Sequence, residues 1–324
     1  MIEVDQLSYN QVRRSSGWIN RSGRAYVLLA GTDSHAWLQG MASNDVKRIE
    51  NGASVIAACF LNPTGHILSE AALVNISSST FLPGLILIDM PIASMPAIMD
   101  HLNRFIITED VELTDVSDKV SFLSVQGPES ESLLEKIDLP SSAICIPSDH
   151  TGSGGFDIYL PADQLKSTET IFTNISCRIS SVIWNLLRVE AGKPEYGYEL
   201  DETVIPLEAG LGSSHISFSK GCYIGQEVIA RIHSRGHINR ELTGFDFGSQ
   251  DGLSPKEKVF EMDEGREVGR ITSVVMDSPA ADGHAIGLGY LRNTYRIPGL
   301  KLRIGETDRV AQVSEIPFYH KPSS

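Results

Sequence analysis

Cysteine is scarce in this sequence, which has four among 324 residues, at positions 59, 145, 177 and 222. No two of them are spaced as a C-x-x-C pair. The sequence therefore predicts neither a disulfide framework nor a zinc or iron–sulfur site built by this chain alone. One cysteine contributed to a site shared with another protein stays compatible with this count, and we expect no resident metal.

The sequence also lacks a long apolar run. Its most apolar region, residues 81–99, is interrupted by three prolines and an aspartate, which excludes a transmembrane helix. The first five residues, MIEVD, are acidic and have no apolar core, so they predict neither a signal nor a transit peptide. These absences predict a cytoplasmic protein without a membrane partner.

Positive charge is in deficit, because 27 lysines and arginines face 41 aspartates and glutamates, giving a net charge of −14. Such a surface repels nucleic acid, so we expect no direct nucleic-acid partner. Residues 220–240 are the exception, since Lys220, Arg231, Arg235 and Arg240 outnumber Glu227 there. This local excess suits a polyanionic ligand, and a solvated strand or loop face explains it equally well.

The length predicts two or three domains. Up to about residue 242, short apolar runs typical of strands, such as 55–61 and 120–125, are followed by segments with helical spacing of apolar residues. This pattern predicts an α+β domain with a duplicated unit over 1–242. Beyond it, six short β-like runs separated by Gly, Asp or Pro turns predict a small antiparallel β-barrel over 243–324.

One stretch, KGCYIGQE at 220–227, places a cysteine between two glycines. Glycine permits backbone turns that other residues resist, so this loop can present the Cys222 thiol in a cleft. Lys220 is near enough in sequence to favour the reactive thiolate, and Gln226 and Glu227 are placed to orient it. The alternative is a buried structural cysteine in a glycine-rich turn.

Two motifs carry a resemblance to a known family. KGCYIGQE resembles the K-G-C-Y-x-G-Q-E signature of the folate-binding YgfZ family, whose relatives include the T-protein, the aminomethyltransferase of the glycine cleavage system. The run RVEAGKPEYG at 188–197, followed by Pro206-Leu-Glu208, is similar to a segment shared by both families. The resemblance implies two interleaved α+β subdomains and a C-terminal barrel around a cavity for tetrahydrofolate.

The resemblance also implies roles for particular residues. Glu190 is the candidate to accept two neighbouring N–H groups of a pterin, and Arg188 belongs to the same motif. Trp184 is the candidate to stack on folate, with a core tryptophan as the alternative. Because residues six apart do not share a helical face, Trp184 and Glu190 converge only if a helix ends between them. Arg235, in the basic stretch, is the candidate for the folate glutamyl tail.

Departures from the family pattern limit the prediction. In the T-protein an aspartate of a G-G-x-x-D-D segment assists aminomethyl transfer, and Ser69 and Glu70 stand at the two acidic positions here. The T-protein also lacks the cysteine motif, so both differences argue against glycine cleavage. An aromatic residue found in some family members is replaced by Arg24, which removes a stacking group.

Three functions remain open from the sequence. The first is a tetrahydrofolate-dependent factor for maturation or repair of iron–sulfur enzymes, including those of tRNA modification, with Cys222 as nucleophile, redox switch or transient cluster ligand. Its partners would be those enzymes or their assembly proteins. The second is a folate-dependent aminomethyl or one-carbon transferase that uses Glu70. The third is a non-catalytic folate-binding scaffold.

Overall fold

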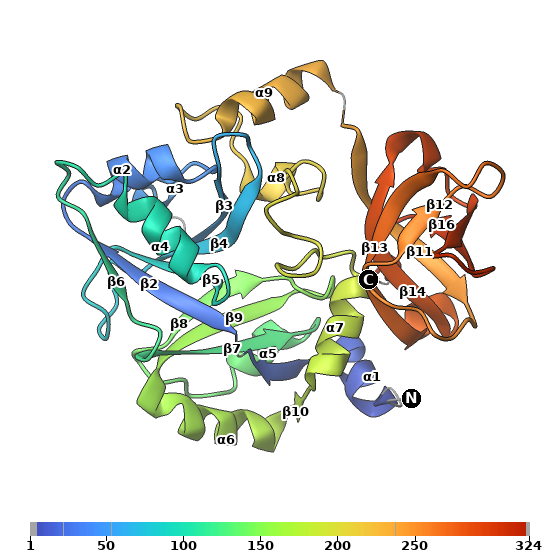
Figure 1. The fold of residues 1–324 in the computed structure, drawn as a ribbon. Coiled ribbons are helices and arrows are strands. Elements are labelled where there is room, and N and C mark those ends of the chain that lie inside the picture. Colours follow the sequence, from blue (N-terminus) through green and yellow to red (C-terminus); the bar gives the residue numbers. More distant parts are fainter. Residues whose placement is uncertain (1–4, 22, 53, 237, 322–324) are drawn as a thin grey trace.

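The computed structural model describes residues 5–21, 23–52, 54–236 and 238–321 (Figure 1). The N-terminal residues 1–4, on which the expectation about targeting segments rests, lie outside this part. Within the described residues no helix is both long and apolar enough to cross a membrane. The strands of the described chain form two five-stranded sheets and one closed barrel.

The first sheet has the order β3-β4-β5-β2-β6 and is antiparallel throughout. One face is covered by short helices whose apolar residues, including Trp37 and Ile98, pack into one cluster with the strands. Its elements are β2 (Arg24–Ala30), α2 (Ser34–Met41), α3 (Lys47–Glu50), β3 (Val55–Leu61), β4 (Ile67–Asn75), β5 (Ile86–Pro91), α4 (Met95–Asn103) and β6 (Glu112–Asp115).

The second sheet has the order β10-β1-β7-β9-β8, with β1 and β10 parallel and the other pairs antiparallel. Trp18 and Phe172 lie in its outer apolar cluster. Its elements are α1 (Gln6–Arg14), β1 (Gly17–Asn20), β7 (Val120–Gln126), α5 (Ser130–Leu134), β8 (Ile144–Ser148), β9 (Gly155–Pro161), η1 (Ala162–Gln164), α6 (Leu165–Ile175), β10 (Cys177–Arg178) and α7 (Ser181–Glu190).

The two sheets are interleaved along the chain, as predicted. The chain passes from β1 in the second sheet to β2 in the first, and returns between β6 and β7. Tyr26 and Leu28 of the first sheet share a buried cluster with Phe122 and Tyr159 of the second. The sheets therefore pack against each other through these inner residues.

The closed barrel confirms the predicted C-terminal fold, with strand order β11-β14-β13-β12-β15-β16. Phe245 and Phe247 alternate with outward residues along the first strand and fill its interior, as alternating side chains do in a half-buried strand. Its elements are β11 (Arg240–Gly248), β12 (Lys258–Phe260), β13 (Glu267–Ser278), η2 (Pro279–Ala281), β14 (His284–Arg292), η3 (Asn293–Tyr295), β15 (Lys301–Ile304) and β16 (Val310–Ser314).

The basic stretch after residue 220 differs from its sequence interpretation as a strand or loop face. It contains α9 (Gln226–Arg235), preceded by the short helix α8 (Gly212–His215). Gly225 and Gly236 bound α9 with positive φ angles of 82° and 64°, a conformation that glycine adopts without strain. Only Ile229 of this helix is buried, so its apolar stripe is too narrow to predict a helix from spacing alone.

Candidate functional site

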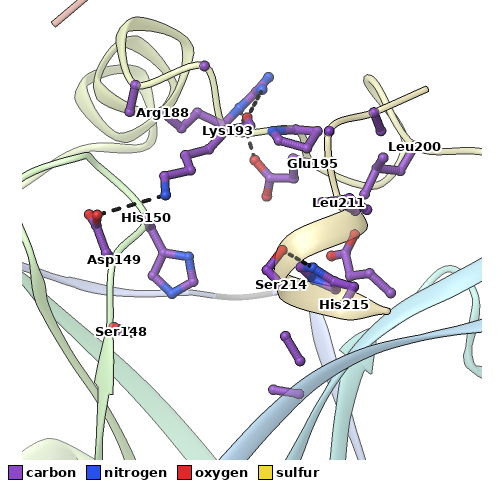
Figure 2. A pocket seen from close by; sticks show the side chains of 18 of the residues that line it. Ser148, Asp149, His150, Arg188, Lys193, Glu195, Leu200, Leu211, Ser214 and His215 are labelled. Carbon is purple, nitrogen blue, oxygen red and sulfur yellow. Dashed lines mark hydrogen bonds and ion pairs between the residues drawn. The ribbon is translucent and has the colours of Figure 1, made fainter. Parts of the chain in front are cut away.

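A cavity of about 850 Å³ lies where the two sheets, the end of α7 and the barrel meet. Its walls come from β3 to β5, β8 and β9, the turn after α7, residues 209–215, and barrel residues such as Glu241 and Arg296. Figure 2 shows Asp149 and His150 on one wall and Ser214 and His215 on another. The volume lies in the range of small-molecule and cofactor sites.

Trp184 of α7 lines this cavity, where the sequence placed a folate-stacking residue. The guanidinium carbon of Arg21 lies 4.5 Å from the centre of the Trp184 ring, and the His150 ring centre lies 5.2 Å from it. Its indole Nε1 is buried and has no hydrogen-bond partner among the described residues. Arg21 and His150 therefore already cover part of the Trp184 ring, while its indole N–H has no hydrogen-bond acceptor among the described residues.

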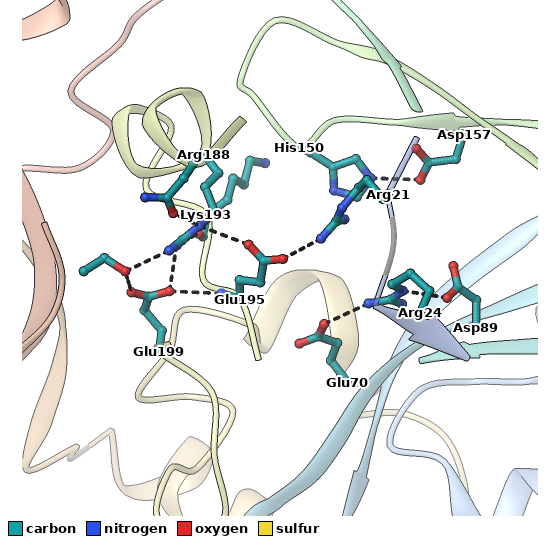
Figure 3. Close-up of polar contacts among 12 residues, drawn as sticks. Arg21, Arg24, Glu70, Asp89, His150, Asp157, Arg188, Lys193, Glu195 and Glu199 are labelled. Carbon is teal, nitrogen blue, oxygen red and sulfur yellow. Dashed lines mark hydrogen bonds and ion pairs between the residues drawn. The ribbon is translucent and has the colours of Figure 1, made fainter. Parts of the chain in front are cut away.

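Arg188 also lines the cavity, and its side chain is fixed on every side. It bonds Glu199 at 2.8 Å, Ser273 of the barrel at 2.8 Å, and Glu195 at 3.1 Å (Figure 3). Arg21 bonds the other oxygen of Glu195 at 2.5 Å. Arg188 thus joins α7 to the barrel and, together with Arg21, holds the Glu195 carboxylate at the cavity wall.

Glu190 is not among the residues that line the cavity, and its role in binding a pterin stays a prediction. Helix α7 continues to Glu190, and six residues of helix turn its side chain well away from the direction of Trp184. Its fully buried carboxylate accepts from Arg13 and Tyr9 on one oxygen, and from Ser278 Oγ and the Ala280 backbone N–H on the other. All four contacts come from the protein, so Glu190 ties α1 and the barrel to α7.

Glu70 of β4 lines the cavity, and its carboxylate is not fully hydrogen-bonded within the protein (Figure 3). Arg24 bonds its Oε1 at 3.3 Å and Asp89 at 2.6 Å, whereas Glu70 Oε2 is buried without a partner among the described residues. Burial raises the pKa of Glu70 more than Arg24 lowers it. This carboxyl is therefore poised to donate or accept a hydrogen bond inside the cavity.

The opposite wall carries His215 of α8, whose Nδ1 lies 2.7 Å from Ser214 Oγ. Burial, with a smaller effect of Lys193, lowers its pKa to about 4. His215 is thus neutral at physiological pH.

Near Trp184, His150 Nε2 lies 2.8 Å from the buried Asp157 carboxylate. Burial alone would raise the pKa of Asp157, but contacts with His150 and Ser124 hold it below its ordinary value.

The cysteine motif lies apart from this cavity. None of Cys222, Lys220, Gln226, Glu227 or Arg235 is among its lining residues. Cys222 is exposed on the loop before α9. Gln226 Oε1 accepts from the Tyr223 backbone N–H at 3.3 Å, and the Glu227 side chain is 83% exposed and pairs with Arg231. The predicted site residues therefore do not form one site. Trp184 and Arg188 line the cavity, and the residues of the cysteine motif lie elsewhere.

Lys220 contacts backbone carbonyls, and its role in favouring the Cys222 thiolate stays a prediction. Its Nζ donates to the carbonyl oxygens of Gln39, Ala42 and Asn44 at 2.6, 2.6 and 2.9 Å. These carbonyls lie at and just beyond the end of α2, where a helix leaves acceptors unsatisfied. Burial lowers the pKa of Lys220 to about 8. All three donors are occupied, so the ammonium fastens the loop to α2.

The predicted basic patch is largely neutralised in the fold. Arg231 pairs with Glu227, and Arg240 pairs with Glu208. Arg235 is exposed at the end of α9 and does not reach the cavity. Arg296 and Lys193 line the cavity and are partly exposed, and they pair with Glu241 and with Asp149. These two residues are better placed than Arg235 for the carboxylates of an extended ligand.

Several cavity residues were not found from the sequence. Arg21 and His150 lie in connections between strands, and Glu195 lies within the recognised 188–197 run but was not singled out. Only the pairing of these segments in three dimensions gives them a common surface. In the described part of the chain, no group of three or more His, Cys, Asp or Glu residues is arranged to hold a metal ion.

Comparisons with known proteins agree with this architecture. Residues 3–145 match the family model of the GCVT N-terminal domain. The chain is 28% identical over 335 residues to an aminomethyltransferase of Listeria monocytogenes serotype 4a (strain HCC23), covering 97% of this chain and 89% of the relative. It is 27% identical over 321 residues to a chloroplastic protein of Arabidopsis thaliana named as a transferase, covering 92% and 71%.

The fold matches a solved structure, the glycine cleavage system aminomethyltransferase T from Bartonella henselae. The TM-score is 0.84 at 16% identity, covering 97% of this chain and 89% of the other. The match shows a common fold. With the sequence similarities, it supports the GcvT-like superfamily that the motifs predict, and the YgfZ family within it stays a prediction.

Proposed function

We propose that the central cavity binds tetrahydrofolate or a close derivative. The observation that carries this proposal is the cavity of about 850 Å³ in a T-protein-like fold, whose wall holds two buried polar atoms without protein partners, Trp184 Nε1 and Glu70 Oε2. Buried polar groups are costly unless they are hydrogen-bonded. A folate offers both N–H donors and carbonyl acceptors, so it fits this donor set.

The residues that line the cavity fall into groups that suit different parts of a folate. Glu70 and Trp184 would hold the polar heterocycle, while Phe122 and Leu211 supply apolar walls. Lys193 and Arg296 would meet the negatively charged tail. When bound, a tetrahydrofolate supplies nitrogen atoms that carry or accept a one-carbon group. The chain's own contribution is to orient that molecule and to exclude water from it.

We propose further that the chain acts in maturation or repair of iron–sulfur enzymes, with Cys222 as the working thiol. Two observations support this: Cys222 is exposed, and Lys220 fixes the loop that carries it to α2. A thiol on a fixed, accessible loop suits contact with another protein. Nucleophile, redox switch and transient cluster ligand remain its three candidate roles.

A folate-dependent one-carbon transferase is the second candidate function. It is favoured by the position of Glu70 in the cavity wall and by the names of the similar proteins. Burial raises the pKa of Glu70, and a cavity carboxyl with a raised pKa is a common form of general acid or base. In this case the reaction would take place beside Glu70, and Cys222 would have no part in it.

The first experiment measures tetrahydrofolate binding to the purified protein by calorimetry. We expect Glu70→Gln and Trp184→Leu to weaken binding by about tenfold or more, since each removes a polar contact in a buried site. Cys222→Ala should bind like wild type and is the matched control. Absence of binding to the wild-type protein would refute the folate proposal.

The second experiment separates the two functions. A strain lacking the gene is complemented with wild type, Cys222→Ala or Glu70→Gln, and an iron–sulfur-dependent tRNA methylthiolation is assayed. Rescue by wild type and Glu70→Gln but not by Cys222→Ala supports the thiol role. Rescue that fails only with Glu70→Gln, together with one-carbon transfer by the purified wild type, supports the transferase.

A further inference from the structure

His150 and Asp157 form a pair at the cavity wall that the proposed function does not use. His150 Nε2 lies 2.8 Å from Asp157 Oδ2, and Asp157 Oδ1 accepts from Ser124 Oγ at 2.7 Å (Figure 3). Asp157 is a buried residue of β9, and these two contacts hold its carboxylate in one orientation. An ionised carboxylate accepts only, so it fixes the proton of a neutral His150 on Nε2.

The backbone on both sides of the pair is also held in place. Gln126 at the end of β7 accepts from the His150 backbone N–H at 2.9 Å. The same amide donates to Ser124 and to Ser148, each at 3.0 Å. One glutamine therefore links the strand beside Asp157 to the loop that carries His150. A side chain held in this way is oriented before any ligand arrives.

The second ring nitrogen of His150 is left for a ligand. No described residue makes a hydrogen bond to Nδ1, and the His150 side chain is one-third exposed where it lines the cavity beside Trp184. Figure 2 shows the ring extending into the pocket. With the proton held on Nε2, Nδ1 is the ring nitrogen left to accept a hydrogen bond at the cavity wall.

We propose that His150, oriented by Asp157, is the group that exchanges a proton with an amine nitrogen of the molecule bound in the cavity. This inference deepens the proposed function and rests on a folate or similar amine binding there. It assigns the acid–base role to His150, so Glu70, the general acid or base of the transferase alternative, keeps only a hydrogen-bonding role here. The arrangement is that of a carboxylate-oriented imidazole, a common form of general acid and base.

The proton balance of this role is simple. A ligand nitrogen that uses its electron pair to form a bond to carbon must lose a proton, and Nδ1 of His150 accepts it. The amine that departs from that carbon takes the bonding electron pair and receives the proton from Nδ1. No oxidant or reductant is required, and the imidazole ends in its starting state.

The charged groups around His150 are three carboxylates and two cations, and two ion pairs join four of them. Lys193 pairs loosely with Asp149 at 3.8 Å, and Arg21 pairs with Glu195. The titratable and charged groups facing it from its own loop and from the neighbouring elements are Asp149, Asp157, Arg21, Lys193 and Glu195.

The test uses the full chain and has two readouts. Nitrogen chemical shifts of labelled histidine identify the tautomer of His150 in the free protein. Calorimetry of tetrahydrofolate binding in buffers of different ionisation enthalpy, at about pH 6, 7 and 8, counts the protons exchanged on binding across the ordinary imidazole range. The variants are His150→Gln and Asp157→Asn. His284→Gln is the matched control, since His284 pairs with Asp246 at 3.0 Å on the barrel, away from the cavity.

We expect wild type and His284→Gln to exchange protons on binding and to carry the His150 proton on Nε2. His150→Gln should bind without that exchange, and Asp157→Asn should lose the tautomer preference and part of the exchange. Unchanged proton counts in His150→Gln, with binding intact, would overturn this inference and leave the folate proposal standing. No binding by wild type would overturn both. If His150→Gln does not fold, the Asp157→Asn result decides.

Discussion

The cavity and the cysteine loop are built on different principles, although motifs of one family predicted both. Around the cavity almost every charge has a partner: Arg24 with Asp89 and Glu70, and Arg21 with Glu195. The cysteine loop instead depends on one lysine that contacts backbone carbonyls. Its thiol and the helix after it face solvent. One region is a preformed interior site, and the other is a fixed but open surface.

This difference shows that residues close together in a sequence motif need not act at the same site in the folded protein. Lys220 and Cys222 are two residues apart, but the Lys220 ammonium donates its hydrogen bonds to backbone carbonyls at the end of α2. Trp184 and Glu190 share α7, but only Trp184 lines the cavity. In both cases the residue beside the chemical group holds the backbone in place. The comparison can be tested by removing these holding residues.

The largest effect is expected from Glu190→Ala. It leaves the guanidinium of Arg13, which is 6% exposed, without its carboxylate, and it removes three further contacts. Breaking a buried ion pair on one side costs about 3–5 kcal/mol. We expect this loss in urea unfolding. Glu227→Ala, which removes an exposed pair, should stay within about 0.5 kcal/mol of wild type.

The opposite result would restore the role predicted from the sequence. If Glu190→Gln keeps its stability but loses tetrahydrofolate binding, then Glu190 belongs to the ligand site and its contacts rearrange on binding. We expect a folded Glu190→Gln to bind with near wild-type affinity.

A smaller effect is expected from Lys220→Met, which keeps the apolar stem and removes the ammonium. Three carbonyls then lose a charged donor, and such a loss costs about 1–3 kcal/mol. Urea unfolding measures the loss, and Lys47→Met, at an exposed lysine of α3, is the control. A variant of unchanged stability whose Cys222 is alkylated much more slowly would show instead that Lys220 serves the thiolate.

Much of the fold could be predicted because its signals are local. The β3–β4 hairpin follows from two apolar runs around an Asn-Pro-Thr-Gly turn, and the strand predicted over 55–61 has these bounds. The barrel follows from six short runs between turns. Elements with weak apolar patterns, such as α1, β8 and α9, escaped because their partners in the fold determine them more than their own spacing does.

The candidate site could be predicted only in part, since it depends on long-range pairing. Trp184 and Arg188 were placed through a motif, and both line the cavity. His150 and Asp157 meet because β8 pairs with β9 and the connecting loop is held by Gln126. Seven positions separate them in the sequence, and no single-chain pattern distinguishes such a pair from a polar loop.

The smallest effect is expected from Asp157→Asn, and it depends on pH. The pKa of Asp157 is held below its ordinary value of 3.8, so the folded state binds this proton less readily than the unfolded state does. Its contribution to stability is therefore complete above the ordinary value, and it is lost as the pH falls through the lower folded value. Near neutral pH we expect Asp157→Asn to cost about 1.5 kcal/mol, the lower end of the scale for a hydrogen bond to a charged group.

Urea unfolding from neutral pH into the acid range measures this difference. The two proteins should converge once the pH falls below the folded value, because wild-type Asp157 is then protonated and resembles the asparagine. The control is Asp246→Asn, which changes the corresponding partner of His284 on the exposed side of the barrel. A difference between wild type and Asp157→Asn that is constant with pH would mean that the Asp157 charge does not stabilise the fold. The cavity wall would then hold His150 by shape alone, unlike the cysteine loop, which the Lys220 ammonium fastens to α2 by hydrogen bonds.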